Sequence, residues 1–308
     1  SYAQGNLLPN LPAPGEVARV AVMTSSGTTS KRVAEKYKFA KCTSDEKVIL
    51  DDPAVNTVFI ATRHDSHARY VIDALKAGKN VYVEKPLCLT LDELVEIEDL
   101  TASTGKGVMI GFNRRFSPFA RMLKKHLGTG KMSMLYRVNA GAIPSSHWIQ
   151  DPAVGGGRIV GEVCHFIDLM TYMCGSTPVK VSASALPDPE GLNDTVNITV
   201  TFANGSTGVV AYYANGPKSL PKEYFEAYHA GVTGIIHDFR RAEIFGRKSE
   251  SMKKANQDKG QPEMMKTFFE SLKNGHLPIP LEEIFSVTKA TFAALESIRE
   301  DGMPVLIH

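Results

Sequence analysis

A histidine and a lysine, far apart in the chain, have the chemistry that proton transfer at an oxygen atom requires. The imidazole of His165 has an unperturbed pKa of about 6.5, close to working pH, so it can accept a proton. The ammonium of Lys85 can hold negative charge as it develops on the oxygen. We expect His165 as the base and Lys85 as the orienting cation. The alternative is Lys85 as the base, which requires it to lose its own proton near neutral pH.

Taken alone, His165 also fits a structural role, because its predicted helix carries Val163, Phe166 and Leu169 and could bury the ring. Three polar stretches elsewhere favour the functional interpretation. Each follows a predicted strand, and their order and spacing are more specific than any one of them. They are Thr62-Arg63-His64-Asp65-Ser66-His67, Glu84-Lys85-Pro86 and Asn113-Arg114-Arg115.

Short apolar strands alternate with amphipathic helices in the N-terminal part of the chain. The expected strands are 18–23, 57–61, 80–83 and 107–110, with helices over 29–37, 67–77 and 91–103. This alternation predicts a doubly wound parallel sheet, covered on both faces, within an α/β domain over residues 1–116. Because the chain opens on a helical stretch, the first strand of that sheet is expected upstream of Ser1.

The C-terminal part has a different pattern of expected elements. One helix is expected over 161–173 and two more over 263–273 and 281–299. Six alternating strands are expected between them, over 179–185, 195–202, 207–213, 224–229, 234–238 and 242–245. This pattern predicts an α+β domain over residues 117–308 with an open, mostly antiparallel sheet. The last helix could pack back on the first domain. An uncovered sheet face favours a homodimer or homotetramer.

A doubly wound sheet binds a dinucleotide beyond the carboxyl ends of its strands. Tyr2 and Ala3 at the start of the chain are interpreted as the back half of a phosphate loop, or else as a frayed terminus. After the strand over 18–23, an acidic residue would select NAD, but the chain has small hydroxyls and then two cations. This favours NADP over NAD. The residues are Ser25, Ser26, Lys31 and Arg32, with a solvated helix face as the alternative for the cations.

Composition excludes several other functions. The 35 basic and 33 acidic residues leave a net charge of +2. Such a small excess of positive charge does not indicate a nucleic-acid-binding protein. No apolar run is long enough for a membrane span. The four cysteines form no CxxC pair, which favours reduced thiols and a cytoplasmic location, and no metal site is predicted.

Together the motifs resemble the glucose–fructose oxidoreductase / inositol dehydrogenase / rhizopine catabolism family (Gfo/Idh/MocA) of nicotinamide-dependent oxidoreductases. The resemblance covers almost the whole chain, including Gly155-Gly156-Gly157, His165-Phe166-Ile167-Asp168 and Pro278-Ile279-Pro280. It implies a Rossmann domain, an open-faced sheet domain and a sugar held between them. It implies that Lys85 reaches the nicotinamide ribose and the substrate hydroxyl, with Glu84 beside it and a cis bond to Pro86 in members with cis-proline.

The same resemblance assigns further residues to the cofactor. Thr62, Arg63, His64 and His67 match the segment that touches the adenine-side phosphate and ribose. Asn113 and Arg115 match the motif near the nicotinamide end.

One departure concerns the residues before His165. Many members carry an Asp four residues before this histidine, where this chain has Gly161, and the nearby carboxylate is Glu162. A spacing of three still permits a shared helix face, so Glu162 is expected to orient or charge-tune His165, or to have another role. This run resembles a subgroup found near surface-polysaccharide genes or fused to alcohol-dehydrogenase-like domains, as if the chain were a domain of something larger.

We therefore expect an oxidoreductase that moves hydride between NAD(P) and a carbinol carbon of a sugar or nucleotide-sugar. The alternatives are a glycoside hydrolase of the same fold and a catalytically weak sugar or nucleotide sensor. Lys85, Glu162 and His165 are the expected substrate contacts, together with Trp148, which is either a sugar-stacking wall or a packing residue. Five polar residues near the second sheet are expected to be scaffold: Tyr212, Tyr213, Asp238, Arg240 and Lys259.

Overall fold

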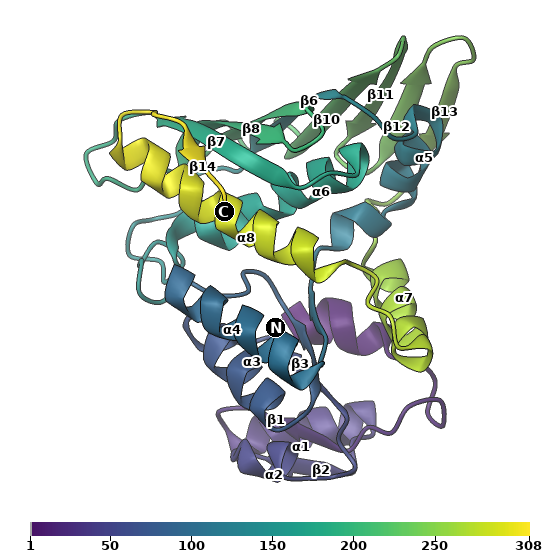
Figure 1. Ribbon diagram of the computed structural model, residues 1–308. Coiled ribbons are helices and arrows are strands. Elements are labelled where there is room, and N and C mark those ends of the chain that lie inside the picture. The colour runs from purple at the N-terminus through teal and green to yellow at the C-terminus, as the bar shows by residue number, and fades with distance from the viewer. Residues whose placement is uncertain (1) are drawn as a thin grey trace.

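The computed structural model describes residues 2–308 as two lobes, one above the other (Figure 1). The lower lobe contains the N-terminal elements, where η marks short helices that are not α-helical. They are η1 (Ala3–Leu7), η2 (Leu8–Asn10), β1 (Ala21–Met23), α1 (Gly27–Tyr37), β2 (Lys41–Thr43), α2 (Lys47–Leu50), β3 (Thr57–Ile60), η3 (His64–Ser66), α3 (His67–Lys76), β4 (Asn80–Val83), α4 (Leu91–Thr104) and β5 (Val108–Ile110).

The strands of the lower lobe run parallel, which confirms the predicted Rossmann arrangement. β1 pairs with β2 in one sheet, and β3, β4 and β5 form a second sheet in that order. The residues of β4 and β5 are buried apart from Asn80, as expected for strands covered on both faces. The apolar pattern does not predict β2, because Lys41-Cys42-Thr43 has no apolar run, or α2, which is only four residues long.

The upper lobe is built on one nine-stranded sheet. Its elements, with the helices that follow them, are η4 (Asn113–Phe116), α5 (Pro118–Leu127), β6 (Ser133–Asn139), η5 (Ile159–Val163), α6 (Cys164–Cys174), β7 (Pro178–Ala185), β8 (Thr195–Phe202), β9 (Thr207–Tyr213), β10 (Glu223–His229), β11 (Val232–His237), β12 (Arg241–Phe245), β13 (Glu250–Lys253), α7 (Gln261–Asn274), α8 (Leu281–Arg299) and β14 (Val305–Leu306). The strand order is β13-β12-β11-β10-β6-β9-β8-β7-β14.

This sheet is antiparallel except for the β6–β9 pair, which confirms the prediction of a mostly antiparallel sheet. Sequence patterning finds six of its strands and misses β6, β13 and β14. Helices α5, α6 and α8 cover one face, and the other face is open (Figure 1).

The last long helix connects the lobes. Helix α8 packs on β7 in the upper lobe and also contacts α4 and β5 in the lower lobe. Lys289 on α8 places its ammonium 3.0 Å from a carboxylate oxygen of Glu98 on α4. Through these contacts, α8 holds α4 and β5 of the lower lobe against the helices that cover the upper sheet.

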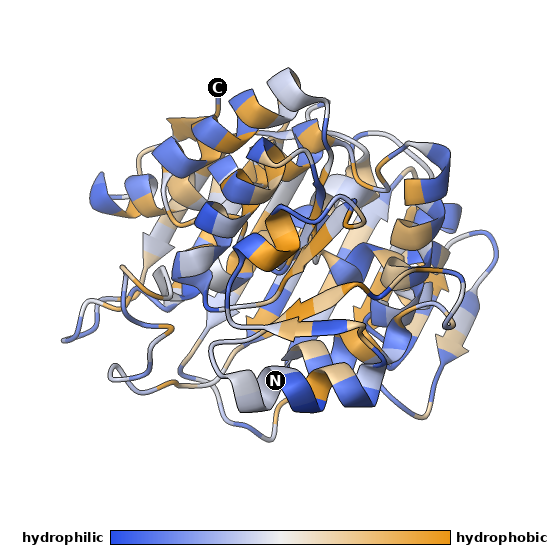
Figure 2. Ribbon diagram, turned by 90° about the horizontal axis from the view of Figure 1, so that it is seen from below, coloured by the Kyte–Doolittle hydropathy of each residue, from blue (hydrophilic) through white to orange (hydrophobic). Residues whose placement is uncertain are grey.

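Helix α6 lies between the sheet and the lower lobe and is buried along nearly its whole length. The single helix expected over 161–173 is in fact two elements, because η5 is a π-helical turn that ends where α6 begins. Figure 2 shows hydrophobic strands in the interior, with helices that present hydrophilic residues outward. The buried residues of η5 and α6 belong to one hydrophobic core that extends through both lobes.

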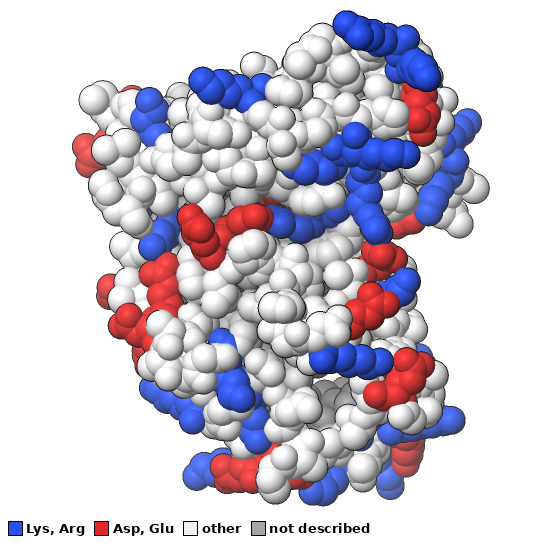
Figure 3. All heavy atoms as spheres, turned by 45° about the vertical axis from the view of Figure 1, so that its right-hand side comes forward, with Lys and Arg blue, Asp and Glu red and all other residues white. Residues whose placement is uncertain are grey.

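Charges of both signs are interspersed on the lower lobe, whereas Lys and Arg form larger groups on the visible part of the upper lobe (Figure 3). Within residues 2–308, no helix has both the length and the apolar character to cross a membrane.

Candidate active site

The lysine after β4 meets the residues before α6. The Lys85–Pro86 peptide is cis, and the Lys85 ammonium donates a hydrogen bond of 2.8 Å to the backbone carbonyl of Gly161. Gly161 lies in η5, four residues before His165. The ammonium from the lower lobe is thus held at the helical segment of the upper lobe that carries the imidazole.

His165 is buried, with 6% of its surface exposed. Its Nδ1 atom has no hydrogen-bond partner among residues 2–308. Burial and the nearby cations of Arg114 and Lys85 hold its pKa well below the usual 6.5. The ring is therefore neutral at physiological pH, and a neutral imidazole has one nitrogen free to accept a proton.

Glu162 turns to the sheet rather than to His165. Its carboxylate accepts hydrogen bonds from the Tyr212 hydroxyl and the Lys222 ammonium, and Arg158 lies 3.4 Å away. Burial alone would raise its pKa, but Lys222 and these bonds lower the pKa to about 2. Because Lys222 neutralises this carboxylate, Glu162 does not act on His165 as a free negative charge. Of the expected roles, the geometry favours the one apart from His165, in which Glu162 positions Lys222.

Glu84 directly follows the last residue of β4. It is buried and accepts a 2.7 Å hydrogen bond from the Tyr82 hydroxyl. Burial raises the pKa of Glu84 to about 7. A Cβ atom at Gly111, after β5, would lie 2.7 Å from Glu84 Oε1, so a larger residue there would displace this carboxyl. Partial burial and the nearby Glu84 also raise the pKa of Tyr2, the N-cap residue of η1.

The two histidines after β3 are engaged by backbone. His64 Nδ1 lies 2.8 Å from the carbonyl of Gly155, and His67 Nδ1 lies 2.7 Å from that of Pro86. Burial lowers the pKa of His64 to about 4 and lowers that of His67. Both rings hold the glycine turn and the Lys85 loop in place, while Thr62 and Arg63 are exposed. A contact of the two histidines with a cofactor phosphate stays a prediction.

Asn113 and Arg115 are part of a buried network. Asn113 donates to the Lys259 carbonyl at 2.8 Å. Arg115 forms ion pairs of 2.5 Å with Asp168 on α6 and 2.8 Å with Glu283 on α8. The Arg115 guanidinium therefore joins η4 to the two helices. The contact of Asn113 and Arg115 with the nicotinamide end stays a prediction.

The other predicted cofactor residues lie where β1 ends and α1 begins. Ser25, Ser26, Lys31 and Arg32 are all exposed there. Ser26 occupies the N-cap position of α1, yet its side chain does not cap the helix. Hydroxyl groups and cations are thus available at this strand end, which fits the adenosine ribose and phosphate of a nicotinamide dinucleotide.

Trp148 of the upper lobe contacts residues that follow β3 in the lower lobe. Its ring packs edge-on against His64, with centroids 4.9 Å apart, and the Arg63 guanidinium lies 5.7 Å from the ring centre. The loop that carries Trp148 leads into Gly155, where a Cβ atom would lie 2.4 Å from the backbone of Ile149. His64 and Arg63 both pack on the ring, and a sugar contact of Trp148 stays a prediction.

Sequence reasoning does not single out Lys222 or Arg158. Tyr212, expected to be scaffold, contacts Glu162 directly. Arg158 donates to Gly141 O at 2.6 Å and so joins the same group. Lys222 follows a Pro-Lys-Ser-Leu-Pro loop whose composition indicates only a turn, so nothing in the sequence signals its ion pair with Glu162.

Two family models match the chain. One, described as an oxidoreductase family with an NAD-binding Rossmann fold, matches residues 4–112. The other, the C-terminal domain of the same Gfo/Idh/MocA family, matches residues 128–248.

Curated relatives include levoglucosan dehydrogenase of Pseudarthrobacter phenanthrenivorans, which is 27% identical over 263 residues, covering 75% of this chain and 67% of its own. Myo-inositol 2-dehydrogenase of Thermotoga maritima is 29% identical over 190 residues, covering 58% and 56%. An uncharacterized oxidoreductase of Bacillus subtilis is 29% identical over 197 residues, covering 62% and 58%. The chain therefore spans between 56% and 67% of the length of these relatives.

Among solved structures, levoglucosan dehydrogenase in complex with NADH and levoglucosan superposes with a TM-score of 0.82 at 21% identity. The match covers 97% of this chain and 94% of that one. At this identity the likeness shows the fold alone, which is a parallel-stranded domain joined to an open-faced sheet.

Proposed function

Because the chain belongs to the Gfo/Idh/MocA oxidoreductase family, we propose that it transfers hydride between a nicotinamide dinucleotide and a carbinol carbon of a sugar or nucleotide-sugar. One observation supports this most strongly. The ammonium of Lys85, at a strand end of the Rossmann lobe, is hydrogen-bonded at 2.8 Å to the segment that carries His165, whose Nδ1 atom has no partner among residues 2–308.

The residues of the chain have separate tasks in this reaction. A bound nicotinamide supplies the hydride acceptor. His165 takes the hydroxyl proton of the substrate, since burial keeps its ring neutral. Lys85 holds the negative charge that develops on the same oxygen, and its bond to Gly161 fixes where that charge can form. Glu162 holds the Lys222 ammonium at the edge of the site.

We infer that NADP is preferred over NAD. The exposed hydroxyls of Ser25 and Ser26 leave room for a 2′-phosphate, and Lys31 and Arg32 supply positive charge. The free thiols of Cys42, Cys88, Cys164 and Cys174 support a reducing compartment, and on this ground we place the chain in the cytoplasm.

The test is a spectrophotometric assay of the purified chain against a sugar panel with NAD and with NADP. We expect turnover with at least one sugar, and a lower KM for NADP. Reversing both charges in a Lys31→Glu/Arg32→Glu variant should raise the KM for NADP roughly tenfold with little effect on NAD. Lys36→Glu, in the last turn of the same helix, is the matched control. Absence of hydride transfer across the panel would overturn the proposal.

A further inference from the structure

The segment between β6 and η5 in the upper lobe docks on the turn that follows β3 in the lower lobe. The backbone N–H of Asp65 donates to the Val154 carbonyl at 3.0 Å, and Nδ1 of His64 lies 2.8 Å from the Gly155 carbonyl. Because a carbonyl oxygen only accepts, Nδ1 carries the proton in this second bond. The His64 ring also packs against Trp148 of the same segment. His64 therefore joins the lobes through both a ring nitrogen and the ring itself.

The same ring leaves little room at Gly161 in η5. A Cβ atom there would lie 3.2 Å from His64 Cε1, closer than an ordinary van der Waals contact, and 3.4 Å from both His64 Nδ1 and the Gly155 carbonyl oxygen. The φ angle of Gly161 is not positive, so its backbone would accept alanine, which a helical segment also favours over glycine. A methyl group at this position is thus opposed by the His64 ring and not by the backbone.

Gly161 is also the residue that receives the Lys85 ammonium. Its carbonyl accepts the 2.8 Å hydrogen bond from Lys85, so the lysine contacts the residue against which the His64 ring packs. Burial lowers the pKa of His64 to about 4, and the ring is therefore uncharged near the ammonium. A displacement of Gly161 would move its carbonyl and with it the ammonium. Reaction rates depend steeply on the position of such groups.

We propose that His64 is a positioning residue for hydride transfer, because its ring holds the Gly161 carbonyl where the Lys85 ammonium meets it. This inference rests on the proposed function for the role of Lys85. It is distinct from the expected contact of His64 with a cofactor phosphate. A positioning residue changes kcat and leaves the affinity for the cofactor unchanged, whereas a phosphate ligand changes that affinity.

The test is a double-mutant cycle between His64 and Gly161, assayed with NADP and the sugar that is turned over fastest. Asparagine at position 64 keeps a nitrogen where Nδ1 lies, which can still donate to Gly155, but it has no atom at Cε1. Gly161→Ala should lower kcat about tenfold or more in the wild type, and less than about threefold in His64→Asn, where the space beside position 161 is free. The dissociation constant of NADP, measured by calorimetry, should stay within about threefold in all four proteins.

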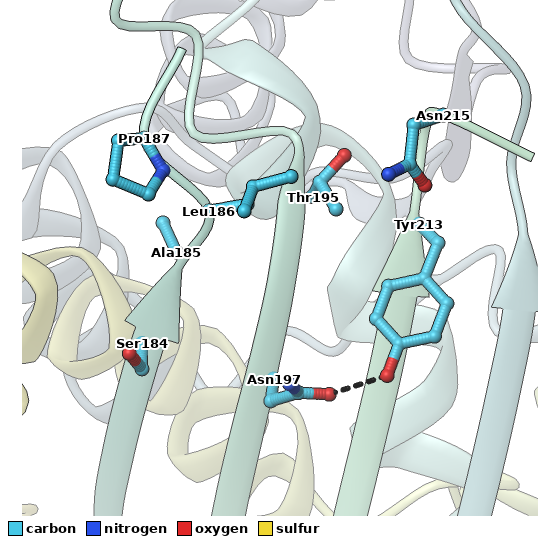
Figure 4. Close-up of a pocket in the computed structure, with 8 residues that line it drawn as sticks. All are labelled: Ser184, Ala185, Leu186, Pro187, Thr195, Asn197, Tyr213 and Asn215. Atoms are coloured by element: carbon cyan, nitrogen blue, oxygen red, sulfur yellow. Dashed lines mark hydrogen bonds between the residues drawn. The ribbon is translucent and has the colours of Figure 1, made fainter.

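Tyr213→Phe is the control for kcat. The Tyr213 hydroxyl donates to Asn197 at 2.8 Å, the same length as the bond made by His64. This pair joins β9 to β8 and lines a hollow of about 380 Å³ with other uncharged residues (Figure 4). Side chains alternate along a strand, so Tyr213 lies on the face opposite to Tyr212, which contacts Glu162. Removing the Tyr213 hydroxyl should leave kcat within about twofold of the wild type.

A second readout needs no turnover. Trp148 is the only tryptophan of the chain, so its emission reports on the ring that packs against His64. His64→Asn should shift this emission to longer wavelength as the indole ring gains water, and Gly161→Ala should change the emission only when His64 is present. His147→Asn is the control and should cause no such shift, because His147 is exposed and lies beside Trp148 on the same segment.

The inference is wrong if Gly161→Ala changes kcat by the same factor in both backgrounds, or in neither. It is also wrong if His64→Asn weakens NADP binding and leaves kcat unchanged. If no sugar is turned over, the proposed function fails, and the emission cycle then decides whether the His64 ring and position 161 are coupled. Turnover with equal effects in both backgrounds would retain the function and refute the positioning role.

Discussion

At the scale of residues, burial sets the protonation of the groups around Lys85. The imidazole of His165 is kept neutral and the carboxyl of Glu84 is kept partly protonated by the same loss of water. Glu162, which is also largely buried, keeps its charge because Lys222 and Tyr212 hold it. Three neighbouring groups thus have three different protonation states near neutral pH.

Glu84 gives a pH-dependent prediction. Its pKa is about 7 in the folded chain, above the ordinary 4.5, so the native state retains a proton that the unfolded chain releases. The stability contributed by this group is fully present below pH 4.5 and is lost as pH rises to about 7. Relative to Glu84→Gln, the wild type should lose up to roughly 3 kcal/mol over this interval.

Denaturant unfolding of both proteins between pH 4 and pH 8 measures this difference. Subtracting the two curves removes the contributions of other groups, such as Asp168, whose pKa burial raises to about 6. Parallel curves for wild type and Glu84→Gln would show that the carboxyl titrates normally.

The residue types that carry the chemistry can be predicted from the sequence, but not their partners. Lys85 and His165 stand out by motif and spacing. Lys222 does not, because its ion pair with Glu162 joins residues 60 positions apart and exists only once the loop before β10 folds back. The ion pair of Arg115 with Glu283 is likewise invisible in the sequence, because it joins residues 168 positions apart.

At the scale of elements, α4 stabilises the loop that carries Lys85. Thr90 accepts a hydrogen bond from the backbone N–H of Glu93, and Glu93 in turn accepts from the N–H groups of Leu89 and Thr90 at 2.8 and 3.1 Å. This capping box satisfies N–H groups that would otherwise lack partners at the helix start. It also fixes the chain four residues after Pro86.

Removing this cap should therefore destabilise the fold. Thr90→Ala is expected to lower the free energy of unfolding by about 1 kcal/mol, measured by denaturant titration. Ser103→Ala, at the other end of α4, is the control, because Ser103 is exposed and bonds only within its own helix. An equal effect of the two substitutions would contradict the importance of the cap.

Elements with continuous apolar runs or clear alternation can be predicted from the sequence, and the others cannot. β3, β4 and β5 are predicted because each is an apolar run, preceded in β3 by Thr57 and in β4 by Asn80. β6 is missed although it lies at the centre of the upper sheet, since Arg137 and Asn139 interrupt its apolar residues. Its position depends on pairing with β9 and β10, which are distant in sequence.

At the scale of the whole molecule, the open face of the upper sheet predicts association. Tyr228 on β10 and Phe245 on β12 are 46% and 47% exposed, and both are opposite Thr233 in the strand register. The two aromatic side chains lie on either side of Thr233, on the face that no helix among residues 2–308 covers. We propose that this face joins copies of the chain in a homodimer or homotetramer.

Light scattering and sedimentation at micromolar concentration test this proposal. The wild type should be a dimer or a tetramer, and Tyr228→Glu/Phe245→Glu should shift it to monomer because two charges would be buried in the interface. Leu91→Glu, an exposed apolar position on α4 in the lower lobe, is the control. A monomeric wild type would contradict the proposal.

The central claim is that Lys85 and His165 act on one substrate oxygen. The most direct measurement is kcat/KM of Lys85→Ala and His165→Ala from pH 5 to pH 9, with cofactor binding verified by fluorescence. We predict a loss of roughly 10² or more in each variant. In the wild type, because the pKa of His165 lies below 6.5, its titration should leave the rate flat above that pH. Turnover within a few-fold of wild type in both variants would contradict the account.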